Sequence, residues 1–252
     1  MLVEIPPNAR EAVRPLFAGF RGVHGIVAAA LAGAMGKVEA DDHDRPHVAM
    51  ITLDFHLIAG NPGASAAEQA VRGLSVPWSA LTSRRDWEPL LRRHWGADLR
   101  TRTRVAFQPG QWGRRGLRGF KEAVPTGFTL KRIGAEDAER FAELEDSLVY
   151  NFPSLRDFAS RGVGFGVEHE GQFVAGCSSF ALGGGCLEFE IDTHPDFRRR
   201  GLAAACAAAM IEYCLDAGLE PCWDAHNQAS AELATKLGFV SPAPYEAFEV
   251  RE

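Results

Sequence analysis

Five ionisable side chains alternate along two short segments of the C-terminal part of the chain. Glu188, Glu190 and Asp192 lie at every second position of one segment, and Asp224 and His226 do so in another. Because residues i, i+2 and i+4 of a β-strand share a face, the three carboxylates are expected side by side. Such a face must line a polar groove or meet cations, because buried charges need partners. Like charges raise the pKa of a neighbouring carboxyl, which suits it to accept a proton near neutral pH.

A turn that suits a phosphate group follows the first of these segments. It joins an expected strand, Leu187–Asp192, to an alanine-rich helix, Ala203–Leu215, through three arginines and a glycine. The first backbone N–H groups of a helix have no partner in the helix and point toward an anion. Gly201 and Ala203 let the backbone approach a pyrophosphate, and the arginines supply positive charge. The residues expected at the phosphate are Arg198, Arg199, Arg200, Gly201, Leu202, Ala203 and Ala204.

These segments resemble two motifs of the GNAT superfamily of N-acetyltransferases. The acyl-CoA-binding motif of that family, Q/R-x-x-G-x-G/A, is matched by Arg198-x-x-Gly201-x-Ala203. The second motif is a short strand that ends in asparagine, followed by a helix that closes on Gly-Phe. Its matched positions are Asn227, Ser230, Leu233, Gly238 and Phe239. The alternative is an ordinary βαβα unit with a basic turn.

The resemblance implies an α/β (α+β) fold and acetyl-CoA as co-substrate. In this superfamily helices flank a mixed central sheet, and two parallel strands of the sheet splay apart. Here those strands would be Leu187–Thr193 and Pro221–His226, with pantetheine inserted between them. The further residues that the resemblance places at the cofactor are Ile191, Asp192, Thr193, Asn227 and Ser230.

The catalytic residues found in many relatives are missing from this chain. Ala234 stands where many have a tyrosine acid, and Cys222 stands where some have a glutamate base. From the ionisable groups near the expected splay, we predict Glu190 as the general base, acting directly or through a water, with His226 as the alternative. An opposing interpretation pairs Glu188 and Glu190 with arginines from the N-terminal part of the chain.

The chain is expected to have two parts. Residues 126–252, the C-terminal half, form the predicted GNAT acetyltransferase domain. Residues 1–125, the N-terminal half, form an α+β domain with a substrate-binding or lid role, and a Gly- and Arg-rich linker is predicted over Gln108–Pro125. One interpretation of the N-terminal half is a degenerate second copy of the fold. The whole chain resembles a branch of two-part bacterial acetyltransferases that includes zwittermicin-resistance enzymes.

The two halves carry opposite net charge. The N-terminal half has 17 Lys and Arg against 12 Asp and Glu, a net charge of +5, and the C-terminal half has 10 against 21, a net charge of −11. Opposite charges favour packing between the halves and an acidic cleft for a cationic acceptor. The basic stretch Arg84–Lys121 could instead contact nucleic acid or the 3′-phosphate of CoA. Its aromatic residues have core-like spacing, so we favour a solvated face with ion pairs and no nucleic-acid partner.

Hydrophobic periodicity predicts the remaining elements. In the N-terminal half, we expect helices over Pro7–Phe17, Val23–Met35, Ala64–Leu74 and Arg84–Trp95, one long or two paired strands over Val48–Ala59, and a strand over Leu99–Phe107. In the C-terminal half, we expect a strand over Gly127–Ile133, helices over Ala135–Ser147 and Ser154–Ser160, and a hairpin of Gly164–His169 with Gln172–Leu182.

The composition predicts a globular cytoplasmic protein. Apolar residues make up 46% of the chain and charged residues 24%. No apolar segment approaches the roughly 20 residues that span a bilayer. The five cysteines are scattered with no C-x-x-C pair, so we expect reduced core thiols and no structural zinc or other metal. A monomer or homodimer is expected.

The predicted function is transfer of acetyl from acetyl-CoA to an amine of a small molecule, by direct attack in a ternary complex. One alternative is a protein or peptide N-acetyltransferase. The other is an acyl-CoA-binding or sensor module without turnover, which Ala234 and Cys222 would fit. The N-terminal half favours the small molecule, because it would close over a compact acceptor better than over a polypeptide.

Overall fold

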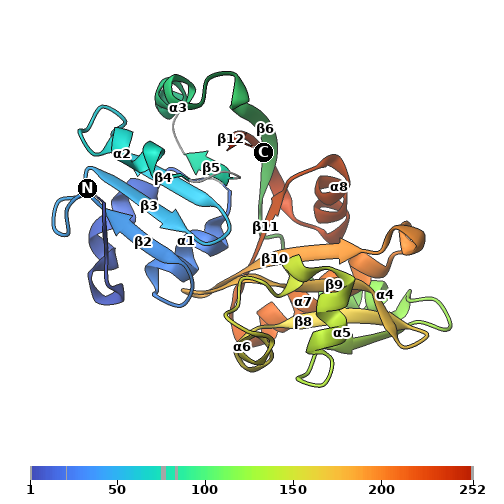
Figure 1. Cartoon of the computed structure of the whole chain (residues 1–252). Helices are drawn as coiled ribbons and strands as arrows, with labels where there is room; N and C mark the ends of the chain where they lie inside the picture. Colours follow the sequence, from blue (N-terminus) through green and yellow to red (C-terminus); the bar gives the residue numbers. More distant parts are fainter. Residues whose placement is uncertain (1, 21, 75–77, 83–84, 251–252) are drawn as a thin grey trace.

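Strands of both halves form one mixed sheet in this computed structural model, which describes residues 2–20, 22–74, 78–82 and 85–250 (Figure 1). The N-terminal half contributes β1 (Val3–Glu4), β2 (Lys37–Ala40), β3 (Val48–Thr52), β4 (His56–Gly60), β5 (Trp78–Thr82) and β6 (Arg100–Gln108). The C-terminal half contributes β7 (Thr129–Arg132), β8 (Gly164–His169), β9 (Gln172–Gly183), β10 (Cys186–Thr193), β11 (Glu220–Ala225) and β12 (Val240–Val250). Their order across the sheet is β1-β2-β3-β4-β5-β12-β6-β11-β10-β9-β8-β7.

Helices flank this sheet, as the resemblance implied. The α-helices are α1 (His24–Leu31), α2 (Ala67–Arg72), α3 (Glu88–Trp95), α4 (Arg114–Glu122), α5 (Ala138–Leu144), α6 (Leu155–Arg161), α7 (Leu202–Ala217) and α8 (Gln228–Leu237). The 3-10 helices are η1 (Pro7–Phe17), η2 (Arg85–Trp87), η3 (Gly96–Asp98), η4 (Asp146–Leu148) and η5 (Pro195–Phe197).

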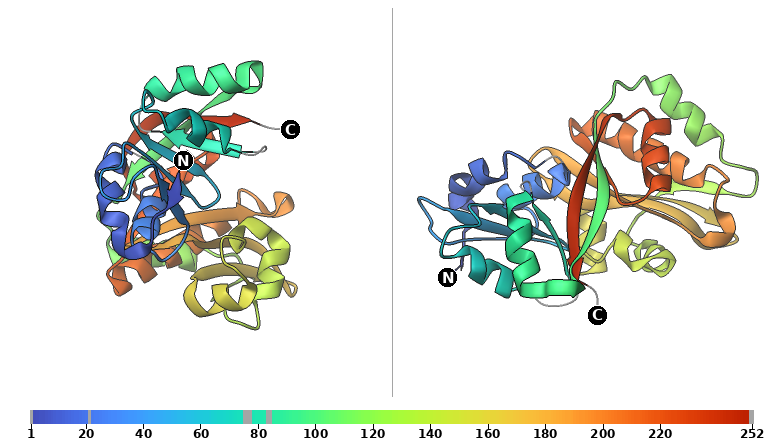
Figure 2. Two further views of the ribbon diagram at one scale, coloured as in Figure 1. Left: turned by 60° about the vertical axis from the view of Figure 1, so that its left-hand side comes forward. Right: turned by 90° about the horizontal axis from the view of Figure 1, so that it is seen from above.

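The strand pairing repeats on the two sides of the sheet centre. Strands β1 to β4 pair antiparallel and β5 pairs parallel to β4, just as β7 to β10 pair antiparallel and β11 pairs parallel to β10. The last strand of each half crosses to the other half: β6 pairs with β11, β12 pairs with β5, and the two pair with each other. Figure 2 shows β6 in green beside β12 in red, between the halves. The N-terminal half therefore has the pairing that a second copy of the fold would have.

Several elements of the N-terminal half differ from the expectation. The apolar run 48–59 forms two paired strands, β3 and β4, which was one of the two alternatives. The helix expected over Val23–Met35 ends at Leu31, because Gly33 and Gly36 adopt positive φ of 73° and 77°. Strands β1, β2 and β5 of this half were not predicted, and neither was β12 of the C-terminal half. Residue 84, with which a predicted helix began, lies outside the described residues, and that segment forms η2 and α3.

The linker predicted over Gln108–Pro125 is wrong for most of its length. Residues Arg114–Glu122 form α4, which packs against α7. Leu117 is buried there, at 1% exposure, while Arg114, Arg115 and Arg118 face solvent. The glycines and arginines of this segment resembled a loop, but one apolar stripe is enough to hold the helix against its neighbour.

The two halves share a hydrophobic core. One cluster of buried residues joins Ile26 and Ala29 of α1 to Phe180 and Ala181 of β9 and Ala247 of β12. Another surrounds the alanine-rich α7, whose small side chains let it lie close to the sheet. Among the described residues no helix has both the length and the apolar composition needed to cross a bilayer.

Candidate active site

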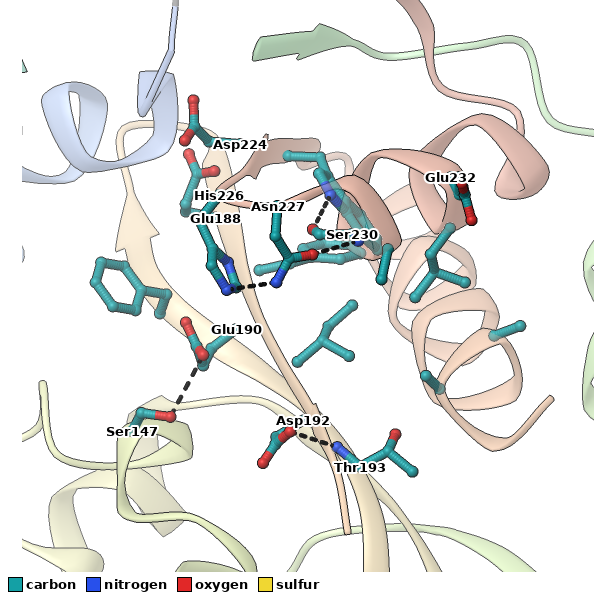
Figure 3. A pocket seen from close by; sticks show the side chains of 18 of the residues that line it. Ser147, Glu188, Glu190, Asp192, Thr193, Asp224, His226, Asn227, Ser230 and Glu232 are labelled. Atoms are coloured by element: carbon teal, nitrogen blue, oxygen red, sulfur yellow. Dashed lines mark hydrogen bonds between the residues drawn. The ribbon is translucent and has the colours of Figure 1, made fainter. Parts of the chain in front are cut away.

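A cavity of ≈ 790 Å³ lies between the halves and runs along β10. The N-terminal half contributes to its lining Val23, Ile26, Asp54, Phe55 and Arg104. The C-terminal half contributes the carboxylate strand, the phosphate turn and the start of α8, part of which Figure 3 shows. The predicted site residues therefore meet in one place. Arg200 is the exception, since it is not part of the lining and its guanidinium lies over the ring of Phe197.

The parallel strands β10 and β11 separate within this cavity. Their register ends with Glu188 opposite Cys222. Beyond this point, β11 pairs from Trp223 onward with β6, on its other edge. Strand β10 continues to Thr193 and pairs there with β9. The β11-facing backbone of residues 189–193 is thus left for a ligand. This is the splay that the resemblance implied, and it brings the backbone of the expected pantetheine-binding residues into the cavity wall.

The turn before α7 presents free backbone donors to the other end of the cavity. Ala205 N–H donates to Gly201 O at 3.1 Å, so the preceding N–H groups have no earlier carbonyl in the helix. Arg199 and Gly201 adopt positive φ of 65° and 83°, which orients successive N–H groups toward one point. A Cβ placed on Gly201 would have nothing within 4 Å, so the space before the helix is open to a phosphate.

The start of α8 is fixed by a small hydrogen-bond network. Asn227 Oδ1 accepts from Ser230 N–H at 2.9 Å and so caps the helix, and Ser230 Oγ accepts from Trp223 Nε1 at 3.1 Å. Asn227 Nδ2 donates to His226 Nε2 at 2.8 Å, as Figure 3 shows. Burial, followed by the charge of Arg104, lowers the pKa of His226, which therefore stays neutral at pH 7. Its Nε2 is already occupied, which weakens the case for His226 as the base.

Glu190 lies in the middle of the cavity. Ser147 Oγ donates to Glu190 Oε1 at 3.3 Å, and Figure 3 shows this bond beside the open space. Burial raises the pKa of Glu190 to about 7, with further increases from the charges of Asp54 and Asp192. The expected direction is confirmed, although burial contributes more than Asp192 does. A carboxylate with such a pKa is half ionised at neutral pH and suits proton transfer.

Glu188 is enclosed at the point where the strands separate. Its Oε2 accepts from the backbone N–H of Gly25 at 3.0 Å, and the side chain is buried. Burial and then the negative charge of Asp224 raise the pKa of Glu188 to about 8. Among the described residues, neither Glu188 nor Glu190 forms an ion pair with an arginine, so the interpretation that paired them with the N-terminal arginines is wrong.

One of the ion pairs that join the halves lies at the cavity and is formed by Arg104 of β6 and Asp224 of β11. Arg104 Nε donates to Asp224 Oδ1, and Tyr245 of β12 donates its hydroxyl to Asp224 Oδ2 at 2.7 Å. The guanidinium of Arg104 also lies over the ring of Phe55, 5.0 Å from its centroid. Burial still raises the pKa of Asp224, because it outweighs the nearby positive charge. The strands exchanged between the halves thus place this network at the cavity wall.

Sequence reasoning missed Asp54 and Tyr150. Asp54 lies in the turn between β3 and β4, and Tyr150 follows η4. Burial, followed by the charge of Asp54, raises the pKa of the Tyr150 hydroxyl. The surroundings also raise the pKa of Asp54, mainly by desolvation. The signal available was a lone acid in an otherwise apolar run, which is costly unless it serves a site.

The two positions where relatives have the acid and base are closed off from the cavity. Ala234 is fully buried, and the Cys222 thiol is buried with its pKa raised by contact with Cys186 and by burial. Neither lines the cavity. The acid and base of other relatives therefore have no counterpart at these positions.

A second group of ionisable residues lies outside the cavity. His24, Cys186 and Glu220 bring possible metal-ligand atoms within 4.8 Å of one another. His24 and Glu220 are half-exposed, with 3.8 Å between Nε2 and Oε1. The chemistry proposed below does not use this group, and the expectation that the protein holds no metal stays a prediction.

Comparisons with known proteins agree with this geometry. The model of the GNAT acetyltransferase family matches residues 14–248. Over 231 residues the chain is 32% identical to an uncharacterized N-acetyltransferase of Bacillus subtilis, YdfB, covering 84% of this chain and 85% of that protein. A solved GCN5-related N-acetyltransferase-like protein of Streptococcus suis is 31% identical, with a TM-score of 0.85 over 97% of this chain and 99% of that one. A tandem GNAT protein from the clavulanic acid biosynthesis pathway shares the fold at 15% identity, with a TM-score of 0.60 over 99% of this chain and 96% of that one.

Proposed function

The chain belongs to the GNAT acetyltransferase family, and we propose that it transfers acetyl from acetyl-CoA to an amine of a small molecule in a ternary complex. The observation that carries this proposal is the continuity of the cavity. One open space joins the N-terminus of α7, the splay of β10 and β11, and the carboxylate of Glu190. Each part of a two-substrate acyl transfer thus has a place along one path.

The residues present fit acetyl-CoA. The N–H groups at the start of α7 and the nearby Arg198 and Arg199 would hold the pyrophosphate, since they combine unpaired donors with positive charge. The unpaired backbone of β10 between Phe189 and Thr193 would receive the pantetheine arm. The acyl group would then lie near Glu190, between the two halves.

Glu190 would accept the proton that the acceptor amine must lose. An alkylammonium with a pKa near 10.4 is neutral in only about one molecule in a thousand at pH 7. The neutral nitrogen attacks the thioester carbonyl, the C–N bond forms, and the C–S bond breaks to release the CoA thiolate. Glu190 takes one proton from the ammonium before the attack, directly or through a water. The second proton, which the nitrogen loses as the amide forms, passes to solvent, and solvent protonates the thiolate. Ser147, which donates to Glu190 at 3.3 Å, would orient the carboxylate.

The N-terminal half would form one wall of the acceptor site. Asp54 and Phe55 come from the β3–β4 turn, and Val23 and Ile26 come from α1. Such a closed wall favours a compact acceptor over a polypeptide segment. We keep the interpretation of this half as a degenerate copy of the fold as part of the proposal.

A panel of small amines and amine-containing antibiotics, incubated with the full chain and acetyl-CoA, tests the proposal. Thiol release that depends on the amine, together with an acetylated product found by mass spectrometry, would support it. Release only with peptides would favour the protein acetyltransferase alternative. Tight acetyl-CoA binding by calorimetry without any amine-dependent thiol release would favour the module without turnover.

A further inference from the structure

We infer that the acceptor carries a second cationic group, and that Asp54 binds this group while the reacting amine lies at Glu190. The inference rests on the proposed function and names its substrate class: a compact amine with an additional ammonium or guanidinium group.

The acceptor end of the cavity has more acids than cations. The described lining residues there include four carboxyls, Asp54, Glu188, Glu190 and Asp224, and one permanent cation, Arg104. Lys236, which also lines the cavity, comes from α8. Arg104 is paired with Asp224 and its guanidinium lies over Phe55, so Asp224 balances its charge before a ligand binds. The other arginines of the lining belong to the phosphate turn at the far end. An anionic acceptor would therefore be repelled, and a cationic one attracted.

Glu188 is a further carboxyl at this end of the cavity that has no ion-pair partner among the described residues. Its side chain is 4% exposed and lines the cavity. Only Oε2 accepts a hydrogen bond from the described residues, from Gly25, and no cation pairs with the carboxyl. Because burial raises the pKa of Glu188 to about 8, this carboxyl is mostly protonated at neutral pH, and a cationic group in the cavity would favour its ionised form.

Asp54 is the acid best placed to anchor a ligand. It is exposed, and it lines the same cavity as Glu190. Beside it, the ring centroids of Phe55 and Phe180 are 5.8 Å apart, and those of Tyr150 and Phe180 are 6.4 Å apart. A short apolar chain would lie along these rings, with one charged end at Asp54 and the reacting end at Glu190.

Matched acceptors test this inference. Straight-chain diamines from ethylenediamine to cadaverine would be compared with the monoamines and amino alcohols of equal length, by acetyl-CoA-dependent thiol release. We expect kcat/KM for the best diamine to exceed that for its monoamine by about tenfold or more, as one favourable charge contact provides. The amino alcohol, which keeps the length and polarity without the charge, should resemble the monoamine.

Variants assign the preference to a residue. Asp54→Asn should reduce the diamine-to-monoamine ratio of kcat/KM to near one, mainly through KM, and Asp54→Glu should restore part of it. Asp44→Asn, at an exposed acid of the same half outside the cavity, should leave the ratio unchanged.

The outcomes separate the inference from the proposed function. Equal kcat/KM for diamines and monoamines in the wild-type chain, or an unchanged ratio in Asp54→Asn, would overturn the inference while acetyl transfer stands. Absence of thiol release with every amine would overturn both. Calorimetry provides a reading without turnover, because putrescine should bind wild type more tightly than Asp54→Asn, and equal affinities count against Asp54.

Discussion

The backbone N–H of Gly25 donates to the carboxyl of Glu188, 163 residues further along the chain, at 3.0 Å. A Cβ added to Gly25 would lie 2.7 Å from Glu188 Cβ, so α1 can approach β10 this closely only with glycine at that position. The contact fixes the N-terminal half against the strand that carries the proposed base. It also encloses Glu188, so the ionisation of this carboxyl affects the free energy of unfolding.

Replacement of Glu188 by Gln should change how stability depends on pH. The pKa of Glu188 is raised to about 8 in the folded chain, against about 4.3 in an unfolded one. The folded state therefore binds its proton more tightly, so the stabilisation is complete below pH about 4.3 and is lost as the pH rises through about 8. Urea unfolding across this range should show a falling free energy of unfolding in wild type and a flatter profile in Glu188→Gln. Glu143→Gln, at an exposed position on α5, should keep the wild-type slope.

Introduction of a carboxylate at the phosphate turn should abolish cofactor binding. Gly201→Asp would place a Cβ and a negative charge in the open space before α7, where the pyrophosphate is expected. Calorimetry with acetyl-CoA should detect no binding.

Gly218→Asp is the matched control, because Gly218 also has positive φ, 67°, and open space, but at the other end of α7. Both variants lose some stability from the strained backbone. Only Gly201→Asp should lose acetyl-CoA, and unchanged affinity in a folded Gly201→Asp protein would remove the basis for placing the cofactor.

The buried ion pair of Arg104 and Asp224 should contribute more to stability than an exposed ion pair of the N-terminal half. The side chains of Arg104 and Asp224 are 16% and 3% exposed. Arg104→Met would leave Asp224 buried without its cation and close to Glu188, which costs about 3–5 kcal/mol of unfolding free energy. The double variant Arg104→Met with Asp224→Asn should recover most of this loss. Arg14→Met, at an ion pair with Glu11 whose side chains are 53% and 74% exposed, should cost about 1 kcal/mol or less.

Local sequence signals predicted the elements of the C-terminal half well. The strand–turn–helix–strand–helix order from Leu187 to Leu237 is present, and the hairpin turns at Glu170-Gly171, where both residues have positive φ. The pairing of β6 and β12 with strands of the other half could not be predicted from local sequence signals. Strand β12 contains Pro242 and Pro244 and has no clean alternation, and its partners lie more than 130 residues away. Pairing at that separation is decided by the whole fold.

Local sequence signals also predicted only part of the candidate site. The carboxylates of β10 could be placed on one face from period-two spacing alone, and they do line one cavity. Asp54 could not be assigned there, because its place depends on how the β3–β4 turn packs against the C-terminal half. The pairing of Arg104 with Asp224 rather than with Glu188 depends on the register of β6 and β11, which no local pattern specifies.

Replacement of the proposed base should remove a limb of the pH profile. Because the pKa of Glu190 is about 7 and the base acts when ionised, kcat/KM in wild type should rise with pH and level off above about 7. Glu190→Gln keeps the shape and removes the basicity, so turnover should fall by about 10²–10⁴-fold and this acidic limb should disappear. Acetyl-CoA affinity should hardly change, because backbone groups are expected to make the cofactor contacts.

His226→Ala is the variant that can reassign this role. The hydrogen bond from Asn227 occupies His226 Nε2, so we expect a smaller loss of turnover and a retained acidic limb. If His226→Ala loses both while Glu190→Gln keeps wild-type turnover, the histidine is the base. If both variants keep turnover and the limb, the acceptor binds already neutral, and catalysis depends on holding the amine against the thioester.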